Sequence, residues 1–366
     1  MKIIEPVRNF YGRFERPISS FSLIAGFVFD ALTLHRADTL FENLWILGHL
    51  ILIGVFICLI HIHKGKEGDE TDPSKAHFWY VNILQFIFGG TLSAYLVLYF
   101  RSADIFVAWP FIAILVLAFI ANESLKRHYI RLSFQISLFF LSIYAFTIFL
   151  LPVVLHKIGT GVFLISGFVS LVTIVLFIIT LFYFIKDRNL RAKYTSEKLT
   201  FVLIAGIFIL VNLLYFTNLI PPIPLSLKDA GVYHSIERNG KGDYAVTYED
   251  HGWKRYFEFF PNYTQSPGKP VYVFSAIFSP EALNLNVVHE WQYLDTTQTR
   301  WVTEGIVSLP VVGGRDGGFR TYSMRYNLAE GKWRVKIKTK EGLNIGHVRF
   351  NVVNASEEVL LTEEVK

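Results

Sequence analysis

The sequence predicts a polytopic α-helical membrane protein with about seven transmembrane helices and a C-terminal all-β domain. Three observations predict this class. Apolar runs of membrane-spanning length fill the first part of the chain, charged side chains avoid those runs, and the hydrophobic period then changes from helical to alternating. Only 18% of the 366 residues are charged, whereas soluble domains usually carry about 25%. We expect a transmembrane domain over 1–220, a proline-containing linker leading into the next domain over 221–242, and a β-sandwich domain over 243–366.

Seven apolar runs are expected to cross the membrane. Each is near the roughly 20 residues that a helix needs to span a hydrocarbon core of about 30 Å. The runs are Ile18–Leu34, Leu44–Ile60, Phe78–Phe100, Ile105–Ala121, Leu132–Leu155, Gly161–Ile185 and Leu199–Ile220. An odd number of crossings places the N-terminus and the β-domain on opposite sides of the membrane.

The distribution of basic residues predicts the orientation. The segment before the first run and every second loop after it hold fifteen Lys and Arg, whereas the alternate loops hold only Arg36, Arg101 and Lys157. Cytoplasmic loops carry this kind of excess. We therefore expect a cytoplasmic N-terminus and an extracytoplasmic β-domain. The excess also accounts for the net charge of +5, so the charge does not indicate nucleic-acid binding.

Few polar residues fall inside the apolar runs. Asp30 and His49 are the ionisable ones, and such groups are functional candidates because burying them is costly. Asp30 is also explained by pairing with Arg36 or by reaching the interface, and His49 by a hydrogen bond within the bundle. Cys58 is the one cysteine, so no disulfide within the chain is expected. The loop beginning at His61 is interpreted as a mixed-charge solvated loop without a metal site.

The C-terminal part alternates apolar and polar residues between turn signals, which predicts an antiparallel sandwich of the immunoglobulin or fibronectin class. The expected strands are Asp243–Glu249, Val271–Phe278, Val287–Leu294, Trp301–Leu309, Phe319–Tyr326, Lys332–Thr339 and Ile345–Val352. Before them, Pro221, Pro222 and Pro224 are expected to end the last helix.

The last two expected strands predict a basic face. Apolar side chains alternate with basic ones in both strands, so a hairpin between them would gather the basic residues on the outer face. These candidate ligand-binding residues are Arg334, Lys336, Lys338, His347 and Arg349. A solvated sheet face is one interpretation. A site for anionic partners, such as phosphate-bearing lipid heads or envelope polymers, is the other.

Four further residues are ligand-binding candidates. Arg315 and Arg320 belong to the glycine-rich loop Gly313–Arg320, whose backbone can approach a ligand closely, although a tight structural corner would use the same residues. His289 and Trp291 share one strand face, where they form either part of a site or a buried pair. Motifs for nucleophilic catalysis, nucleotide phosphates, dinucleotides and helical zinc sites are absent from the sequence. We therefore expect no enzyme activity, no cofactor and no metal.

Three stretches carry a family resemblance. VYVFSAIFSPEALNLNVVHEWQYLD, GGRDGGFRTYS and GKWRVKIKTKEGLNIGHVRFNV resemble the bacterial family called domain of unknown function 2914, and GFVFDALTLHRAD resembles the membrane region that often precedes that domain. The resemblance implies a bacterial cytoplasmic membrane protein and supplies no reaction. The family's recurring positions correspond here to His289, Trp291, Gly313, Gly314, Arg315, Asp316, Arg320, Trp333 and Arg334.

These observations favour a non-enzymatic membrane protein whose outer β-sandwich binds a component of the cell envelope. The expected partners are the lipid bilayer and an anionic polymer, a lipid head group or a membrane protein, and no nucleic acid. The alternative is a transporter or enzyme that acts on lipid-linked substrates within the helical bundle, with Asp30 and His49 as its polar groups.

Overall fold

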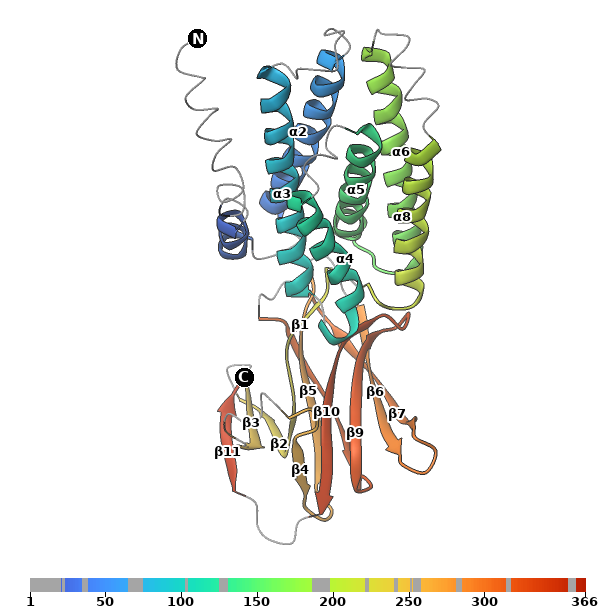
Figure 1. Cartoon of the computed structure of the whole chain (residues 1–366). Helices are drawn as coiled ribbons and strands as arrows, with labels where there is room; N and C mark the ends of the chain where they lie inside the picture. The colour runs from blue at the N-terminus through green and yellow to red at the C-terminus, as the bar shows by residue number, and fades with distance from the viewer. Residues whose placement is uncertain are drawn as a thin grey trace. The chain divides into compact units, whose positions relative to one another are not determined.

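The computed structural model describes residues 21, 24–34, 39–64, 75–102, 105–124, 131–185, 198–220, 224–239, 243–250, 252, 258–280, 285–313, 317–354 and 360–366. The chain divides into a helical unit, Met1–Arg101 with Ala108–Ile223, and a β-unit, Pro224–Lys366 with the short segment Ser102–Val107 (Figure 1).

The helical unit contains six long helices and a shorter apolar helix over Ile24–Thr33 among its described residues. The long helices are α2 (Leu40–Lys64), α3 (Lys75–Ser102), α4 (Ile105–Ser124), α5 (Leu132–Leu155), α6 (Thr160–Phe184) and α8 (Lys198–Phe216). Five of them, α2, α3, α5, α6 and α8, are long and apolar enough to cross a membrane. The helical half predicted from the sequence is thus confirmed.

The last helix ends earlier than the sequence predicts. Asn218 adopts a left-handed backbone conformation with φ 57°, and the amides of Asn218 and Leu219 bond back to the carbonyls of Tyr215 and Leu214. This is a Schellman cap, in which asparagine replaces the more common glycine. The helix therefore stops at Phe216 before the prolines, not at Ile220.

Helix α5 occupies the interior of the helical unit. Eighteen of its 24 residues are buried, and it packs against α2, α6 and α8. Tyrosines of α3 reach it through hydrogen bonds, from Tyr95 Oη to the Ser142 carbonyl at 2.6 Å and from Tyr99 Oη to the Ala145 carbonyl at 3.2 Å. By contrast, α6 and α8 leave many large apolar side chains exposed.

The β-unit has eleven strands in three sheets among its described residues. The strands are β1 (Ser226–Tyr233), β2 (Ser235–Arg238), β3 (Tyr244–Glu249), β4 (Asn262–Gln265), β5 (Pro270–Phe278), β6 (Leu285–Asp295), β7 (Arg300–Val311), β8 (Phe319–Tyr326), β9 (Gly331–Thr339), β10 (Asn344–Asn354) and β11 (Leu361–Val365). Their orders are β1-β5-β8, β4-β10-β9-β6-β7 and β11-β3-β2. All pairs are antiparallel except β4 with β10.

All seven predicted strands are present, each within about three residues of its predicted ends, but the domain departs from a seven-stranded immunoglobulin-like sandwich. Residues 226–238, expected to belong to the linker, instead form β1 and β2. Strands β4 and β11 were also missed, because they are short and polar and their ladders with β10 and β3 hold them in place. A propensity pattern does not contain such long-range pairing.

Two of the sheets pack face to face around a core that includes a buried polar network. His289 of β6 lies between Ser275 of β5 and Ser323 of β8, with 2.9 Å from each ring nitrogen to a hydroxyl oxygen. Trp291 Nε1 donates to Ser323 Oγ at 3.0 Å. Because every partner is satisfied, the network can join the two sheets without the cost of an unpaired buried polar group.

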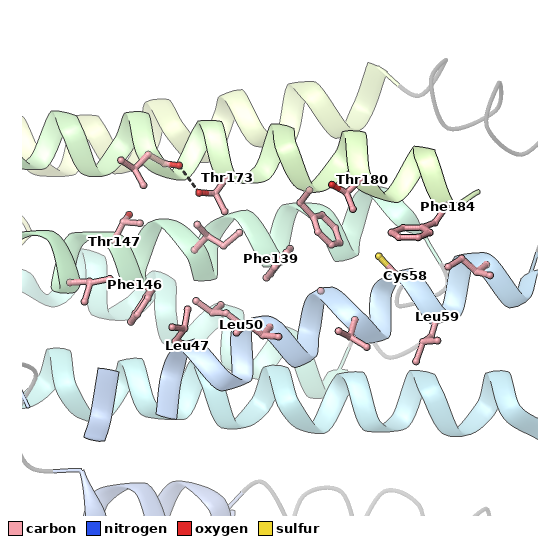
Figure 2. A pocket seen from close by; sticks show the side chains of 18 residues that line it. Leu47, Leu50, Cys58, Leu59, Phe139, Phe146, Thr147, Thr173, Thr180 and Phe184 are labelled. Atoms are coloured by element: carbon pink, nitrogen blue, oxygen red, sulfur yellow. Dashed lines mark hydrogen bonds between the residues drawn. The ribbon is translucent and has the colours of Figure 1, made fainter. Parts of the chain in front are cut away.

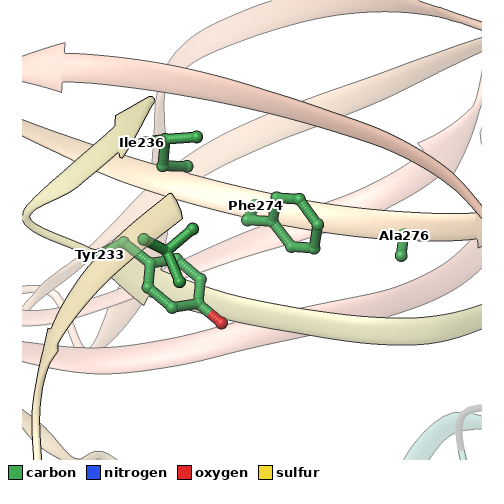
Figure 3. Packing of buried hydrophobic residues seen from close by; sticks show 5 residues of the cluster. Tyr233, Ile236, Phe274 and Ala276 are labelled. Carbon is green, nitrogen blue, oxygen red and sulfur yellow. The ribbon is translucent and has the colours of Figure 1, made fainter. Parts of the chain in front are cut away.

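The third sheet covers the outer face of β1 and β5. Figure 3 shows the buried cluster between them, which includes Ile236 of β2 and Tyr233, Phe274 and Ala276 of β1 and β5, and Val246 completes the set. The predicted basic residues lie on a different sheet, on the outer face of the five-stranded one.

Candidate functional site

The five predicted basic residues share one face of the five-stranded sheet. On β9, Trp333, Val335 and Ile337 are buried, so the residues between them point outward. The register of β10 places His347 opposite Lys336, and Arg349 opposite Arg334. We call the outward set Arg334, Lys336, Lys338, His347 and Arg349 the basic face. Like charges directly across a ladder destabilise a sheet, so the pair Arg334 and Arg349 lowers the stability of this one.

Glu290 of β6 neutralises one end of the basic face. Its carboxylate forms an ion pair with Lys338 and accepts hydrogen bonds from Thr303 Oγ1 and Gln292 Nε2, both at 2.7 Å. Burial raises the pKa of Glu290, but the bonds from Lys338 and Thr303 outweigh it and lower that pKa to about 2. The sequence reasoning missed Glu290, although its alternation with His289 and Trp291 places it on the outer face.

Arg334 is fixed on an aromatic platform. Its Nε donates to Gln292 Oε1 at 2.6 Å, and its guanidinium lies 4.1 Å from the ring centroid of Trp301. Trp301 in turn stacks on Phe260, with centroids 6.2 Å apart and an angle of 14° between the planes. Arg349 also lies over Phe260, at 5.9 Å. These cation–π contacts hold the guanidinium groups in place, and the sequence reasoning missed both aromatic residues.

Lys336 is the central cation of the basic face. Among the described residues, none forms a hydrogen bond or ion pair with it. Its pKa is lowered first by burial and then by the neighbouring charges of Arg334 and Lys338, while Glu290 acts in the opposite direction. A half-buried ammonium between two other cations is a suitable binding partner for a phosphate or carboxylate.

The other predicted ligand-binding residues lie elsewhere. His289 and Trp291 are fully buried in the core network, where burial lowers the pKa of His289 to about 4. Because they are inaccessible, they belong to the packing of the sandwich and not to a surface site. Arg320 forms an ion pair with Asp243 at 2.8 Å, and Arg315 lies outside the described residues.

The structure brings together the two intramembrane candidates, which the sequence reasoning had treated separately. The Asp30 carboxyl interacts with the Ser93 hydroxyl on α3 and with His49 on α2. His61, expected in a solvated loop, is instead buried in α2, with Nε2 2.9 Å from Gln135 Oε1 of α5. The helix extends about one turn further than predicted because this bond satisfies the imidazole. In the part of the chain that the structure describes, no cluster of metal-ligating residues is present.

A groove of about 680 Å³ runs between α2, α5 and α6 (Figure 2). Its walls are apolar, and Cys58 points into it. The hydroxyls of Thr173 and Thr180 donate to the carbonyls of Val169 and Leu176 at 2.8 Å, so these wall residues offer no free donor. Such a groove fits a hydrocarbon chain.

Comparisons with known proteins add little about activity. No curated protein matches the chain. A solved structure of Pseudomonas fluorescens alkylpurine DNA glycosylase AlkC, bound to DNA containing an abasic site analog, matches at 10% identity over 85% of this chain and 99% of that chain, but its TM-score of 0.22 does not indicate a shared fold. The basic face lies within a segment that a family model recognises. Residues 284–352 match the family described as Protein of unknown function (DUF2914), which confirms the resemblance predicted from the sequence.

Proposed function

We propose that this chain is a multi-pass protein of the bacterial cytoplasmic membrane whose β-domain lies outside the cytoplasm and binds an anionic envelope component through the basic face. The observation that carries the proposal is Lys336, a half-buried ammonium set between Arg334 and Lys338 that forms no hydrogen bond or ion pair with the described residues. The ligand class is a polymer or lipid head group that carries phosphate or carboxylate.

The membrane location is supported by the helices themselves. Five of the described helices have spanning length and apolar composition, and α6 and α8 expose side chains such as Phe168 and Phe201. In water, exposed apolar surface on this scale would favour aggregation, whereas in a bilayer it faces hydrocarbon. The orientation rests on the excess of Lys and Arg in alternate loops.

The electrostatics of the basic face support the proposal of anion binding. Arg349 faces the like charge of Arg334 across the β9–β10 ladder, and the nearby carboxylate of Glu290 already forms an ion pair with Lys338. A phosphate beside Lys336 would accept charge-assisted hydrogen bonds and reduce the repulsion between the cations. Such a bond to a charged group contributes about 1.5–3 kcal/mol, which corresponds to roughly 10- to 100-fold in affinity.

A binding assay with the full-length chain tests the proposal. The chain is placed in nanodiscs of zwitterionic lipid and titrated with fluorescent poly(glycerol phosphate), with neutral dextran as the comparison polymer. Lys336→Gln is expected to weaken binding of the phosphate polymer at least tenfold. The matched control Lys340→Gln removes the same charge from the exposed β9–β10 turn and is expected to change binding less than about twofold. Equal effects of the two variants, or no binding by the wild type, would refute the proposal.

The groove favours a second candidate function, in which the bundle holds the hydrocarbon chain of a lipid-linked substrate. Its wall on α2 extends from Leu47 to Ile62, about 22 Å at 1.5 Å per residue. One leaflet offers only about 15 Å of hydrocarbon, so a polyisoprenoid fits this length better than an ordinary acyl chain.

Cys58 lines the groove and is the chain's one cysteine, so it reports on the occupant. Modification of Cys58 by a membrane-permeant maleimide should slow when a polyprenyl phosphate is added to the nanodiscs, and not when phosphatidylglycerol is added. Thr180→Phe, which fills the groove, should slow the modification without any added lipid, whereas Ile179→Phe on the exposed side of α6 should not. Equal rates with both lipids would exclude this function.

A further inference from the structure

Three helices bring polar side chains together inside the helical unit. Asp30 comes from the helix Ile24–Thr33, His49 from α2 and Ser93 from α3. Asp30 is only 5% exposed and Ser93 only 1%. Among the described residues, Ser93 and His49 are the polar side chains that act on the Asp30 carboxyl, and the Ser93 hydroxyl makes no hydrogen bond of standard geometry with them.

The hydrogen bonding of His49 determines which ring nitrogen is available. Its Nδ1 lies 2.9 Å from the carbonyl oxygen of Trp45. A carbonyl oxygen only accepts, so Nδ1 carries a proton and Nε2 is the ring nitrogen left for a second partner. A Cβ built on Gly90 of α3 would lie 3.3 Å from Nε2, so the glycine allows the ring to approach α3 closely.

The charge balance of the cluster follows from its burial. A lone carboxylate in an apolar bundle is costly, and one serine hydroxyl supplies a single donor to offset it. Two arrangements avoid a net charge. Either Asp30 is a neutral acid beside neutral His49, or the Asp30 carboxylate pairs with a protonated His49. Both hold the same single proton, which lies on a carboxyl oxygen or on Nε2.

We infer that Asp30 and His49 form an intramembrane proton-binding site, in which Ser93 contacts the carboxyl and Trp45 fixes the imidazole. The proton is exchanged with water. Glu42 lies two turns before His49 on α2 and is also buried, with contacts of its own. The site is separate from the basic face, so a failure of anion binding would leave this inference intact.

Infrared difference spectroscopy tests the site. Spectra of the full-length chain in zwitterionic nanodiscs are recorded between acidic and alkaline pH, in the region of carboxyl and carboxylate bands. Asp30→Asn should remove one titrating carboxyl band. His49→Gln should shift the midpoint of that band by about one pH unit or more, a tenfold change in proton affinity. The controls Glu341→Gln in the β9–β10 turn and His156→Asn after α5 should leave the Asp30 band unchanged.

Two outcomes would overturn the inference: no band lost in Asp30→Asn, or the same midpoint in the wild type and His49→Gln. If either of these variants does not fold, Ser93→Ala keeps both titratable groups and removes only the hydroxyl. It should shift the frequency and midpoint of one carboxyl band. A spectrum identical to that of the wild type at every pH would then refute the site.

Discussion

Glu290→Gln is expected to destabilise the sheet that carries the basic face, in a pH-dependent way. The pKa of Glu290 falls from its usual 4.5 to about 2 in the folded chain. A difference of about 2.5 pH units, at 1.36 kcal/mol per unit, corresponds to about 3 kcal/mol. The side chains of Glu290 and Lys338 remain 14% and 23% exposed, so solvent screening reduces the expected contribution to about 2 kcal/mol.

The sign of the pH dependence follows from the lowered pKa. A group whose folded pKa is depressed stabilises the fold above its unfolded pKa, and that stability is lost as the pH falls through the folded pKa. The difference between wild type and Glu290→Gln should therefore be full above about pH 4.5 and should disappear near pH 2. Gln is close to Glu in size, so the comparison isolates the charge.

Native-state hydrogen exchange on the full-length chain measures this difference, because it reports local opening free energies of β6 and β9 without requiring two-state unfolding of the whole protein. Glu341→Gln in the exposed turn is the matched control, with an expected change under about 0.5 kcal/mol. A Glu290→Gln difference that is the same at pH 3 and pH 7 would show that packing, not the Lys338 ion pair, accounts for the effect.

Three further predictions concern the fold and its placement. Trp333→Ala should cost about 3–5 kcal/mol in the opening free energy of β9 by hydrogen exchange, because it empties a buried aromatic site; a cost below about 0.5 kcal/mol would contradict the strand register. Gly318→Ala should destabilise the sandwich by at least about 2 kcal/mol in the same assay, because φ is +84° and a Cβ would lie 2.9 Å from backbone, whereas Gly317→Ala should be nearly neutral. A reporter that is active only outside the cytoplasm should be active when fused after Lys366 and silent after Lys186, and the reverse pattern would refute the orientation.

The sequence predicted those parts of the fold whose pattern is local. Strand β9 alternates Trp333, Val335 and Ile337 with basic residues, and its burial follows that alternation. Strand β1 contains Lys228, Asp229 and Gly231 and has no such pattern, so only its ladder with β5 defines it as a strand. The ends of helices also depended on caps that composition does not reveal.

The candidate site was predictable in its cations but not in their partners. Alternation placed the basic residues on one face, since side-chain direction in a strand has a period of two. Which cation is paired depends on β6 and β7, strands whose register is set by the whole sheet. Glu290 and Trp301 lie some 33 to 48 residues before their partners Arg334 and Lys338 in sequence, and no local signal joins them.

The contacts of Lys338 and Arg334 with other side chains decide which cation of the basic face can be replaced in a binding test. If all its cations were equally solvated, replacing them together would remove binding and leave folding intact. Lys338 instead balances the partly buried carboxylate of Glu290, and Arg334 joins Gln292 to the ring of Trp301. Removing either leaves a partly buried group without its partner, which costs about 1–3 kcal/mol. A loss of binding in those variants would therefore mix misfolding with lost contacts. Lys336, which supports no other described side chain through a hydrogen bond or ion pair, is the position where binding and folding separate.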